Sequence, residues 1–313
     1  MKNILIVGAG YMAQEYFNYL VTTNNLITVI GRKKNKIKFN HKKNKNVSIS
    51  YGGIEKSKIN FKQFSHAIVA VNEKYCLSVV SLLIKNKVKS ILVEKPGAKN
   101  IHELKKLQKI ELSSRSKIYI AYNRRFYESI KFVKDLVKKD KGIISTTFSF
   151  TEWIDKIKSA KFEKYLMKKW FYFNSLHLID LIFYLIGDPK LIFSKSDKKN
   201  KNFTKSLYLG FGISKKNIHF SYHSNWESAG RWEILLYTKK RKIILSPLEK
   251  VQIQNRNSIK IEFLNFNNMR DEKFKPGIPG MIDSFLSSKK DLMKLKEYIQ
   301  KFRVYNKIAG YNF

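Results

Sequence analysis

The residues Glu94-Lys95-Pro96 place a carboxylate and an ammonium group directly after an apolar run, Ser90-Ile91-Leu92-Val93. A short apolar run of this kind predicts a buried strand, and the carboxyl ends of parallel strands are where an α/β sheet meets its ligand. A lysine there can stabilise negative charge that develops on a substrate oxygen. Lys95 is therefore our first catalytic candidate, and the alternative is a surface lysine at a strand end.

A second set of residues, Gly8-Ala9-Gly10-Tyr11-Met12-Ala13, fits a phosphate-binding turn. The first glycine allows the tight turn, Gly10 lets a pyrophosphate approach the backbone, and Ala13 is small enough for close helix–strand packing. The amide groups at the helix start, where Tyr11 and Met12 lie, would face the phosphates. Because an apolar run precedes the fingerprint and an amphipathic segment follows it, the sequence predicts dinucleotide binding instead of a purely structural turn.

The choice of cofactor is expected to depend on the end of the second strand, at 26–30. An acidic residue there would bind the ribose 2′-hydroxyl of NAD, but the chain has Gly31-Arg32-Lys33-Lys34. Arg32 can pair bidentately with a 2′-phosphate, so we predict NADP in preference to NAD. From Lys36 onward the basic run is interpreted as a solvated loop. The remaining expected cofactor contacts are Lys33, Val71, Asn72, Glu94 and Lys95.

Two more motifs follow in order, Tyr122-Asn123-Arg124-Arg125-Phe126 and Asn174-Ser175-Leu176-His177-Leu178-Ile179-Asp180. Together with the glycine fingerprint and Glu94-Lys95-Pro96, this order resembles the glucose–fructose oxidoreductase / inositol 2-dehydrogenase (Gfo/Idh/MocA) family. The resemblance covers nearly the whole chain, because the layout of the second half also fits that family's α/β substrate domain. It implies a nicotinamide-dependent oxidoreductase that acts on a sugar, cyclitol or related polyol derivative.

The resemblance also implies roles for individual residues. Lys95 would approach the reacting oxygen, and His177 would act as acid/base. The chemistry is consistent, because hydride transfer at a carbinol requires a group that takes the hydroxyl proton near neutral pH. Family members usually pair through an open sheet, which implies a homodimer or homotetramer. The expected substrate-binding residues are Lys95, Asn123, Arg124, Asn174 and His177.

One position departs from the family pattern. Many members carry Asp four residues before the histidine, where this chain has Phe173. Either His177 relies on another partner or the acid/base work shifts toward Lys95, and a buried structural histidine is the competing interpretation. Asp180 is interpreted as a structural partner within its helix. Arg124 and Arg125 either line the cleft or hold the domains together.

The elements that must position these residues fall into two patterns. Short apolar strands alternate with helices as far as residue 121, which predicts a doubly wound parallel Rossmann sheet in a dinucleotide-binding domain, 1–122. The rest, 123–313, predicts an α+β domain for substrate binding and oligomerisation, with an open, mostly antiparallel sheet. Its last helices can pack back on the first domain. Helices are expected at 127–139, 159–168, 174–186, 279–287 and 290–302, and strands at 143–151 and repeatedly from 205 to 263.

The composition is strongly basic. Lys+Arg is 62 and Asp+Glu is 24, so the net charge is 62 − 24 = +38. Because the lysines are scattered and outnumber the arginines, we attribute the charge to codon composition and expect no specific nucleic-acid partner and no membrane partner. The single cysteine, Cys76, excludes an intramolecular disulfide and fits a reducing, cytoplasmic compartment.

Other signals are weaker. His219 and His223 share a strand face but lack a third ligand, so no metal site is predicted. The segment 224–232 suits either a sugar-binding loop or a hairpin with packed Trp side chains, and Lys275 could touch an anionic substrate. The alternative function is a cofactor-binding sensor or regulator without turnover, which would use its charge on nucleic acid or membrane. A third hypothesis is internal redox chemistry with a retained cofactor.

Overall fold

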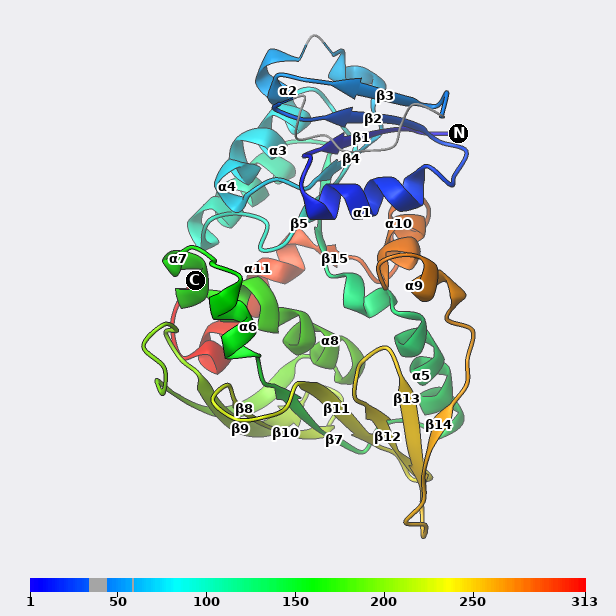
Figure 1. Ribbon diagram of the computed structural model, residues 1–313, viewed down its shortest axis with the longest axis vertical. Coiled ribbons are helices and arrows are strands. Elements are labelled where there is room, and N and C mark those ends of the chain that lie inside the picture. The colour runs from blue at the N-terminus through cyan, green and yellow to red at the C-terminus, as the bar shows by residue number, and fades with distance from the viewer. Residues whose placement is uncertain (34–43, 58) are drawn as a thin grey trace. The chain divides into compact units, whose positions relative to one another are not determined.

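The computed structural model describes residues 1–33, 44–57 and 59–313, so most of the basic loop predicted from Lys36 onward lies outside the described residues (Figure 1). The chain forms two compact units. The first comprises Met1–Asn123 and Arg270–Gln300, and the second comprises Arg124–Met269 and Lys301–Phe313. Each unit contains one sheet with its own core.

The sheet of the first unit has seven strands in the order β15-β6-β5-β4-β1-β2-β3. Strands β1 to β6 pair in parallel, and β15 joins antiparallel to β6. The predicted Rossmann sheet is therefore confirmed. Its strands are β1 (Asn3–Val7), β2 (Leu26–Ile30), β3 (Val47–Ser50), β4 (His66–Val69), β5 (Ser90–Glu94), β6 (Lys117–Ala121) and β15 (Met293–Lys294).

Continuous apolar runs form the central strands because helices cover both faces of such a sheet. In each of β1 and β2, four consecutive residues of the five are buried. Helix α1 packs beside α10, and α3 packs beside α4. The helices of this unit are α1 (Tyr11–Leu20), α2 (Gly53–Lys56), η2 (Phe61–Gln63), η3 (Glu73–Tyr75), α3 (Cys76–Lys85), α4 (Ile101–Leu112), α9 (Met269–Lys273) and α10 (Ile278–Leu286).

The sheet of the second unit has eight strands in the order β14-β13-β12-β11-β7-β10-β9-β8. All neighbours pair antiparallel except β7 and β10, which are parallel, so the predicted mostly antiparallel sheet is confirmed. The strands are β7 (Ser145–Phe150), β8 (Pro189–Asp197), β9 (Leu207–Ser214), β10 (His219–Asn225), β11 (Trp232–Tyr237), β12 (Arg241–Leu245), β13 (Val251–Asn255) and β14 (Ile261–Leu264).

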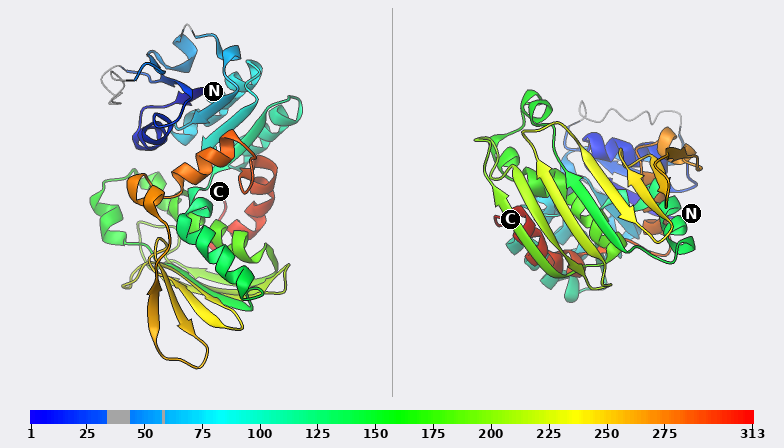
Figure 2. Two further views of the ribbon diagram at one scale, coloured as in Figure 1. Left: turned by 90° about the vertical axis from the view of Figure 1, so that its right-hand side faces the viewer. Right: turned by 90° about the horizontal axis from the view of Figure 1, so that it is seen from below.

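Helices lie behind this sheet, and its other face is uncovered toward the viewer (Figure 2, right). Residues alternate between buried and exposed along β7 and β11, as expected of strands with one covered face. The helices are α5 (Glu128–Lys139), α6 (Ile154–Ser159), α7 (Lys164–Lys168), the π-helix η5 (Phe171–Ser175) and α8 (Leu176–Ile186). Three elements span a unit boundary along the chain: η4 (Asn123–Phe126), α11 (Leu295–Ala309) and α9, whose first residue belongs to the second unit.

Several predicted boundaries were wrong. The helix expected at 159–168 is two short helices, α6 and α7, and the one expected at 290–302 starts at Leu295 after a short strand. The helix expected from 174 begins at Leu176, because 171–175 form a π turn. Strand β8 was missed, because its exposed side is partly apolar and its sequence lacks a clean alternation.

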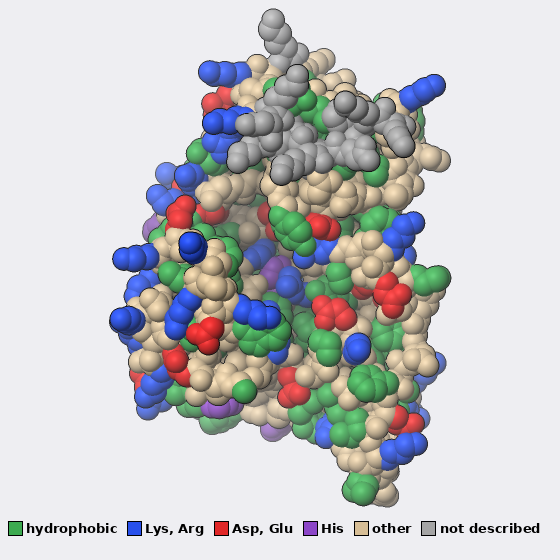
Figure 3. Space-filling view, viewed as in Figure 1, with side chains coloured by type: hydrophobic (Ala, Val, Ile, Leu, Met, Phe, Trp, Pro, Cys, Tyr) green, Lys and Arg blue, Asp and Glu red, His purple; other side chains and the backbone are tan. Residues whose placement is uncertain are grey.

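On the face shown in Figure 3, the lysines and arginines of the described residues are distributed over several places and form no single patch. No helix within residues 1–33, 44–57 and 59–313 has the length and apolarity needed to cross a membrane.

Candidate active site

A pocket of about 520 Å³ lies at the carboxyl ends of β1, β2, β3 and β4 in the first unit. Its lining brings together residues from four separate stretches of sequence. Six of the predicted cofactor residues line it: Gly8, Gly10, Arg32, Lys33, Val71 and Asn72. This place is where an open parallel sheet binds a nucleotide.

The two glycine positions of the fingerprint differ in what a larger side chain would contact. Gly8 has a φ of +132°, and a Cβ there would lie 2.1 Å from the carbonyl oxygen of Ala70. The turn after β1 is therefore in direct contact with the end of β4. A Cβ on Gly10 would meet no atom within 4 Å. Gly10 thus faces open space in the pocket, as the approach of a pyrophosphate requires.

The end of β2 presents Arg32 to the pocket in a defined position. Its guanidinium carbon lies 4.0 Å from the centre of the Tyr75 ring. A hydrogen bond from Arg32 lowers the pKa of Tyr75. No sequence motif pointed to Tyr75, because this partner of Arg32 belongs to η3, which follows β4.

A second group of pocket residues was also missed. Gly52, Gly53 and Glu55 line the pocket from the turn after β3. The Gly-Gly pair is a turn signal that could have drawn attention to this segment. Glu55 brings a carboxylate to the same pocket as Arg32, although the end of β2 itself has none.

Glu94 is the last residue of β5 and Lys95 follows it, at the same carboxyl edge of the sheet as the glycine turn. The Glu94 carboxylate accepts a hydrogen bond from the Tyr16 hydroxyl of α1. Burial, together with the Glu94 charge, raises the pKa of Tyr16 well above its ordinary value. The contact ties the end of β5 to the helix that follows the fingerprint. Lys95 is half-buried, and its peptide bond to Pro96 is cis.

Asn123, predicted to bind substrate, has a structural contact within the first unit. Its amide donates to the Pro276 carbonyl oxygen at 2.9 Å. The neighbouring Lys275 places its ammonium nitrogen 5.0 Å from the centre of the Tyr11 ring. Lys275 therefore adds a positive charge next to the first residue of α1, where the sequence had suggested only an anionic substrate contact.

In the second unit, Arg125 and Asp180 form a buried ion pair. Arg125 donates from Nε at 2.7 Å and from Nη2 at 2.6 Å to the two carboxylate oxygens. The hydroxyl of Tyr305 lies 3.4 Å from the same carboxylate. The interpretation of Asp180 as a structural partner agrees with this geometry.

A carboxylate that was not selected from the sequence, Glu152, binds the predicted substrate-binding residue Asn174 in this unit. Its side chain is 1% exposed. It accepts hydrogen bonds from the Asn174 amide at 2.9 and 3.0 Å and from the Ser175 hydroxyl at 2.7 Å. The π-helix is therefore fixed to the end of β7. The only signal in the sequence was an acidic residue that directly follows an expected strand.

His177 occupies the second position of α8 and is buried, with 5% of its surface exposed. Phe173 lies in the π-helix η5, three residues before the first residue of α8, and its ring makes an edge contact with Tyr165. The carboxylate expected at 173 is thus absent from the sequence, while Glu152 brings one to the neighbouring residue Asn174. Within the described part of the chain, no group of three or more His, Cys, Asp and Glu side chains could hold a metal ion.

The family comparison matches a large part of the first unit. Residues 2–122 match the family described as "Oxidoreductase family, NAD-binding Rossmann fold", Gfo/Idh/MocA. Over these residues the chain is similar to the Gfo/Idh/MocA oxidoreductase family. The fingerprint, the nucleotide pocket and Lys95 all lie within the matched residues. The resemblance inferred from the sequence motifs is therefore confirmed.

Comparison with solved structures supports the same fold. An oxidoreductase from Agrobacterium radiobacter in complex with NAD+, L-tartaric acid and magnesium is similar at a TM-score of 0.76 and 14% identity, over 99% of this chain and 95% of that one. A dehydrogenase from Clostridium difficile is similar at 0.77 and 14%, over 99% of each chain. A UDP-N-acetylglucosamine 3-dehydrogenase from Acidithiobacillus ferrooxidans is similar at 0.74 and 10%, over 99% and 97%. No curated protein matches the chain in sequence.

Proposed function

We propose that this protein is an NADP-preferring oxidoreductase that acts on a CH–OH or C=O group of a sugar derivative. The observation that carries the proposal is the nucleotide pocket, which lies at the same edge of the parallel sheet as Lys95. A nucleotide in this pocket would be bound at the carboxyl edge, where the lysine can act on a substrate oxygen. Two similar structures support the substrate class, because their names include UDP-N-acetylglucosamine and L-tartaric acid.

The residues of the chain would divide the chemistry as follows. When bound, the nicotinamide supplies or accepts the hydride. The Lys95 ammonium group stabilises negative charge on the reacting oxygen, and the His177 imidazole takes or returns the hydroxyl proton. Asn174, held by Glu152, binds a substrate hydroxyl. In the absence of an acidic residue at 173, Glu152 serves as the carboxylate that orders this part of the site.

The preference for NADP is supported by charge at the pocket. Arg32 and Lys33 contribute two positive charges, and Glu55 contributes one negative charge. A 2′-phosphate could accept two hydrogen bonds from a guanidinium already ordered by Tyr75, so little side-chain entropy would be lost on binding. Lys275, beside Tyr11, would face the phosphates at the start of α1.

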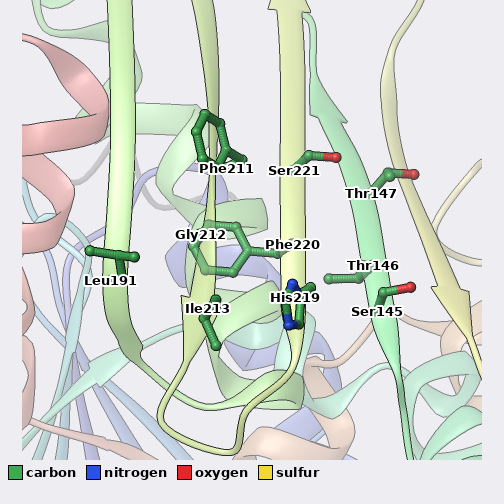
Figure 4. A pocket seen from close by; sticks show the side chains of 10 residues that line it. All are labelled: Ser145, Thr146, Thr147, Leu191, Phe211, Gly212, Ile213, His219, Phe220 and Ser221. Carbon is green, nitrogen blue, oxygen red and sulfur yellow. The ribbon is translucent and has the colours of Figure 1, made fainter.

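We also propose that the protein is a homo-oligomer that pairs through the uncovered face of the eight-stranded sheet. A shallow depression of about 420 Å³ on this face is lined by residues such as Leu191, Phe211 and Ile213 (Figure 4). The rings of Phe193 and Phe211 stack at 5.1 Å between centroids, although each is more than half exposed. Exposed apolar side chains on one sheet face favour burial against an equivalent face.

The test is a titration of the folded protein with NADPH and with NADH, followed by nicotinamide fluorescence. We expect saturable binding that prefers NADPH. Arg32→Ala should weaken NADPH binding by about 10- to 100-fold, the value of a charge-assisted hydrogen bond, with little effect on NADH. Glu55→Gln should strengthen NADPH binding, because it removes the opposing charge.

The Lys95→Ala variant separates cofactor binding from catalysis. It should retain the affinity for NADPH and lose turnover in a screen of sugar derivatives. Failure of both nucleotides to bind, in a folded protein free of retained cofactor, would overturn the oxidoreductase proposal. Nucleotide binding without turnover on any derivative would favour a cofactor-binding sensor.

A further inference from the structure

Cations and indole rings alternate in a row across the second unit. The Lys156 ammonium nitrogen lies 4.3 Å from the centre of the Trp153 ring, and the Arg231 guanidinium carbon lies 4.8 Å from the same ring. Arg231 and Arg124 each lie 4.9 Å from the centre of the Trp232 ring. Contacts of this length between cations and indole rings are attractive, so each residue orders the next. These five residues form the cation–indole row.

Glu152 anchors the centre of the row. Its carboxylate accepts hydrogen bonds from Arg231 Nη1 at 2.8 Å and from Trp232 Nε1 at 3.3 Å. The same carboxylate holds Asn174, three residues before His177. The row is therefore both rigid and connected, within one unit, to residues of the candidate active site.

The row carries more positive charge than its anchor neutralises. Lys156 and Arg231 together carry two positive charges, and Glu152 supplies one negative charge. Across residues 1–33, 44–57 and 59–313, Arg231 donates hydrogen bonds to Glu152 alone, and Lys156 pairs with no carboxylate. A guanidinium has five N–H donors, so Arg231 can bind a further acceptor.

The positive groups are accessible. The Arg231 side chain is 38% exposed, while that of Glu152 is 1% exposed. Trp153 is 47% exposed, and its indole nitrogen is bound to the Gly230 carbonyl oxygen at 2.9 Å. The indole is therefore fixed in orientation with part of its surface open to solvent. A ring fixed in this way offers an apolar face to a ligand that also has polar groups.

We propose that the cation–indole row is a subsite for an anionic group, a carboxylate or a phosphate, on the sugar derivative. The planar fork of Arg231 matches the oxygens of either group, and Lys156 adds a second charge. The exposed indole of Trp153 packs against the C–H face of the sugar ring. The inference rests on the proposed function, to which it adds a substrate class.

A purely structural role gives a different expectation. Arg231 would then serve only to neutralise the buried Glu152, and Lys156 would be an ordinary surface lysine. Lys156 therefore separates the two explanations, because it is exposed and has no part in the Glu152 hydrogen bonds. Lys158 is a matched control, since it is on the same helix and carries the same charge but pairs with Asp155 outside the row.

The experiment is calorimetric titration of the full chain at constant ionic strength, with and without saturating NADP+. The probes are glucose 6-phosphate, glucuronate, glucose and inorganic phosphate. At least one charged sugar should bind about 10-fold or more tightly than glucose. Lys156→Gln and Arg231→Lys should each weaken that sugar by about 10-fold and leave glucose unchanged. Lys158→Gln should match the wild type.

The two charged sugars distinguish a phosphate from a carboxylate as the bound group. Equal binding of charged and neutral sugars, including no measurable binding of any, would overturn the subsite. So would equal losses in Lys156→Gln and Lys158→Gln. If inorganic phosphate binds as tightly as glucose 6-phosphate, the row holds an adventitious ion only, and the proposal fails.

Failure of the subsite can be told apart from failure of the proposed function. NADPH binding is measured on the same variants and should be unchanged, because the nucleotide pocket is formed entirely by the first unit. Normal NADPH binding without any preference for charged sugars would reject the subsite and leave the oxidoreductase proposal standing. If the wild-type protein does not bind NADPH, the oxidoreductase proposal is rejected. The titrations without cofactor would still show whether the subsite binds charged sugars.

Discussion

The two glycines of the fingerprint turn have different surroundings, so an alanine substitution should have different effects at each. Gly10 has an ordinary φ of −84° and open space where a Cβ would lie. We expect Gly10→Ala to change the free energy of unfolding by less than about 1 kcal/mol, because the folded backbone accommodates it. The affinity of the Gly10→Ala variant for NADPH should fall by at least about 10-fold, because the added methyl group would occupy the space that a pyrophosphate needs.

Gly8→Ala should behave in the opposite way and lower the free energy of unfolding by more than about 2 kcal/mol. The added Cβ would meet the Ala70 carbonyl oxygen at 2.1 Å, in a backbone conformation with positive φ. Gly142→Ala is the control, since it has a φ of +111° and no atom within 4 Å of the added Cβ. Urea unfolding and nicotinamide fluorescence measure both effects. An equal loss of stability at Gly8 and Gly10 would contradict this account.

At the scale of residues, the sequence predicted functional groups that depend on local order along the chain. Gly8, Gly10 and Arg32 follow directly from strand ends, and all three line the pocket. Glu55 and Glu152 were missed because each lies near its functional neighbours only in the folded chain. Glu55 lines the same pocket as Arg32, and Glu152 accepts a hydrogen bond from Arg231. Glu152 meets Arg231 only because β7 and β11 are neighbours in the sheet.

The Arg125–Asp180 pair joins three elements of the second unit. Arg125 belongs to η4 and Asp180 to α8, and Tyr305 of α11 reaches the same carboxylate. We expect Asp180→Asn to lower the free energy of unfolding by about 3 kcal/mol, because it removes the negative charge to which the buried Arg125 guanidinium donates two hydrogen bonds. Chemical denaturation with fluorescence detection measures the change.

The control is the same substitution at an exposed pair. Asp197→Asn should cost less than about 1 kcal/mol, because Asp197 and Lys199 are both half exposed. In the double variant Arg125→Met/Asp180→Leu, part of the lost stability should return, since both charges of this pair are then removed. An Asp180→Asn variant as stable as Asp197→Asn would show that the pair does not hold these elements.

At the scale of elements, periodicity predicted the first unit better than the second. The strands of the parallel sheet are short apolar runs between helices, and the strand Leu26–Ile30 has the bounds expected from sequence. Strand β8 was not predicted, because Leu191 and Phe193 are apolar but exposed. Its sequence therefore lacks the alternation of apolar and polar residues that is typical of a strand with one covered face. The π turn at 171–175 has no sequence signature of its own, and its hydrogen bonds to Glu152 stabilise it.

At the scale of the whole molecule, a net charge of +38 opposes self-association. Like charges on two copies repel over roughly 10 Å at 0.1 M salt, and the repulsion weakens as salt rises. The apolar face of the eight-stranded sheet acts in the other direction, because burial of Phe193 and Phe211 is favourable at any ionic strength. The balance of the two effects sets the oligomeric state.

We therefore expect the protein to associate more tightly as salt increases from about 50 to 500 mM, in contrast to complexes held by opposite charges. Phe193→Ser/Phe211→Ser should weaken association by at least about 10-fold, since it removes two stacked aromatic rings from the proposed interface. Leu112→Ser is the control, because Leu112 is equally apolar and 73% exposed but lies at the end of α4 in the first unit. Sedimentation velocity measures both effects. A wild-type protein that stays monomeric at high salt, or a double variant that associates like the wild type, would rule out this face as the interface.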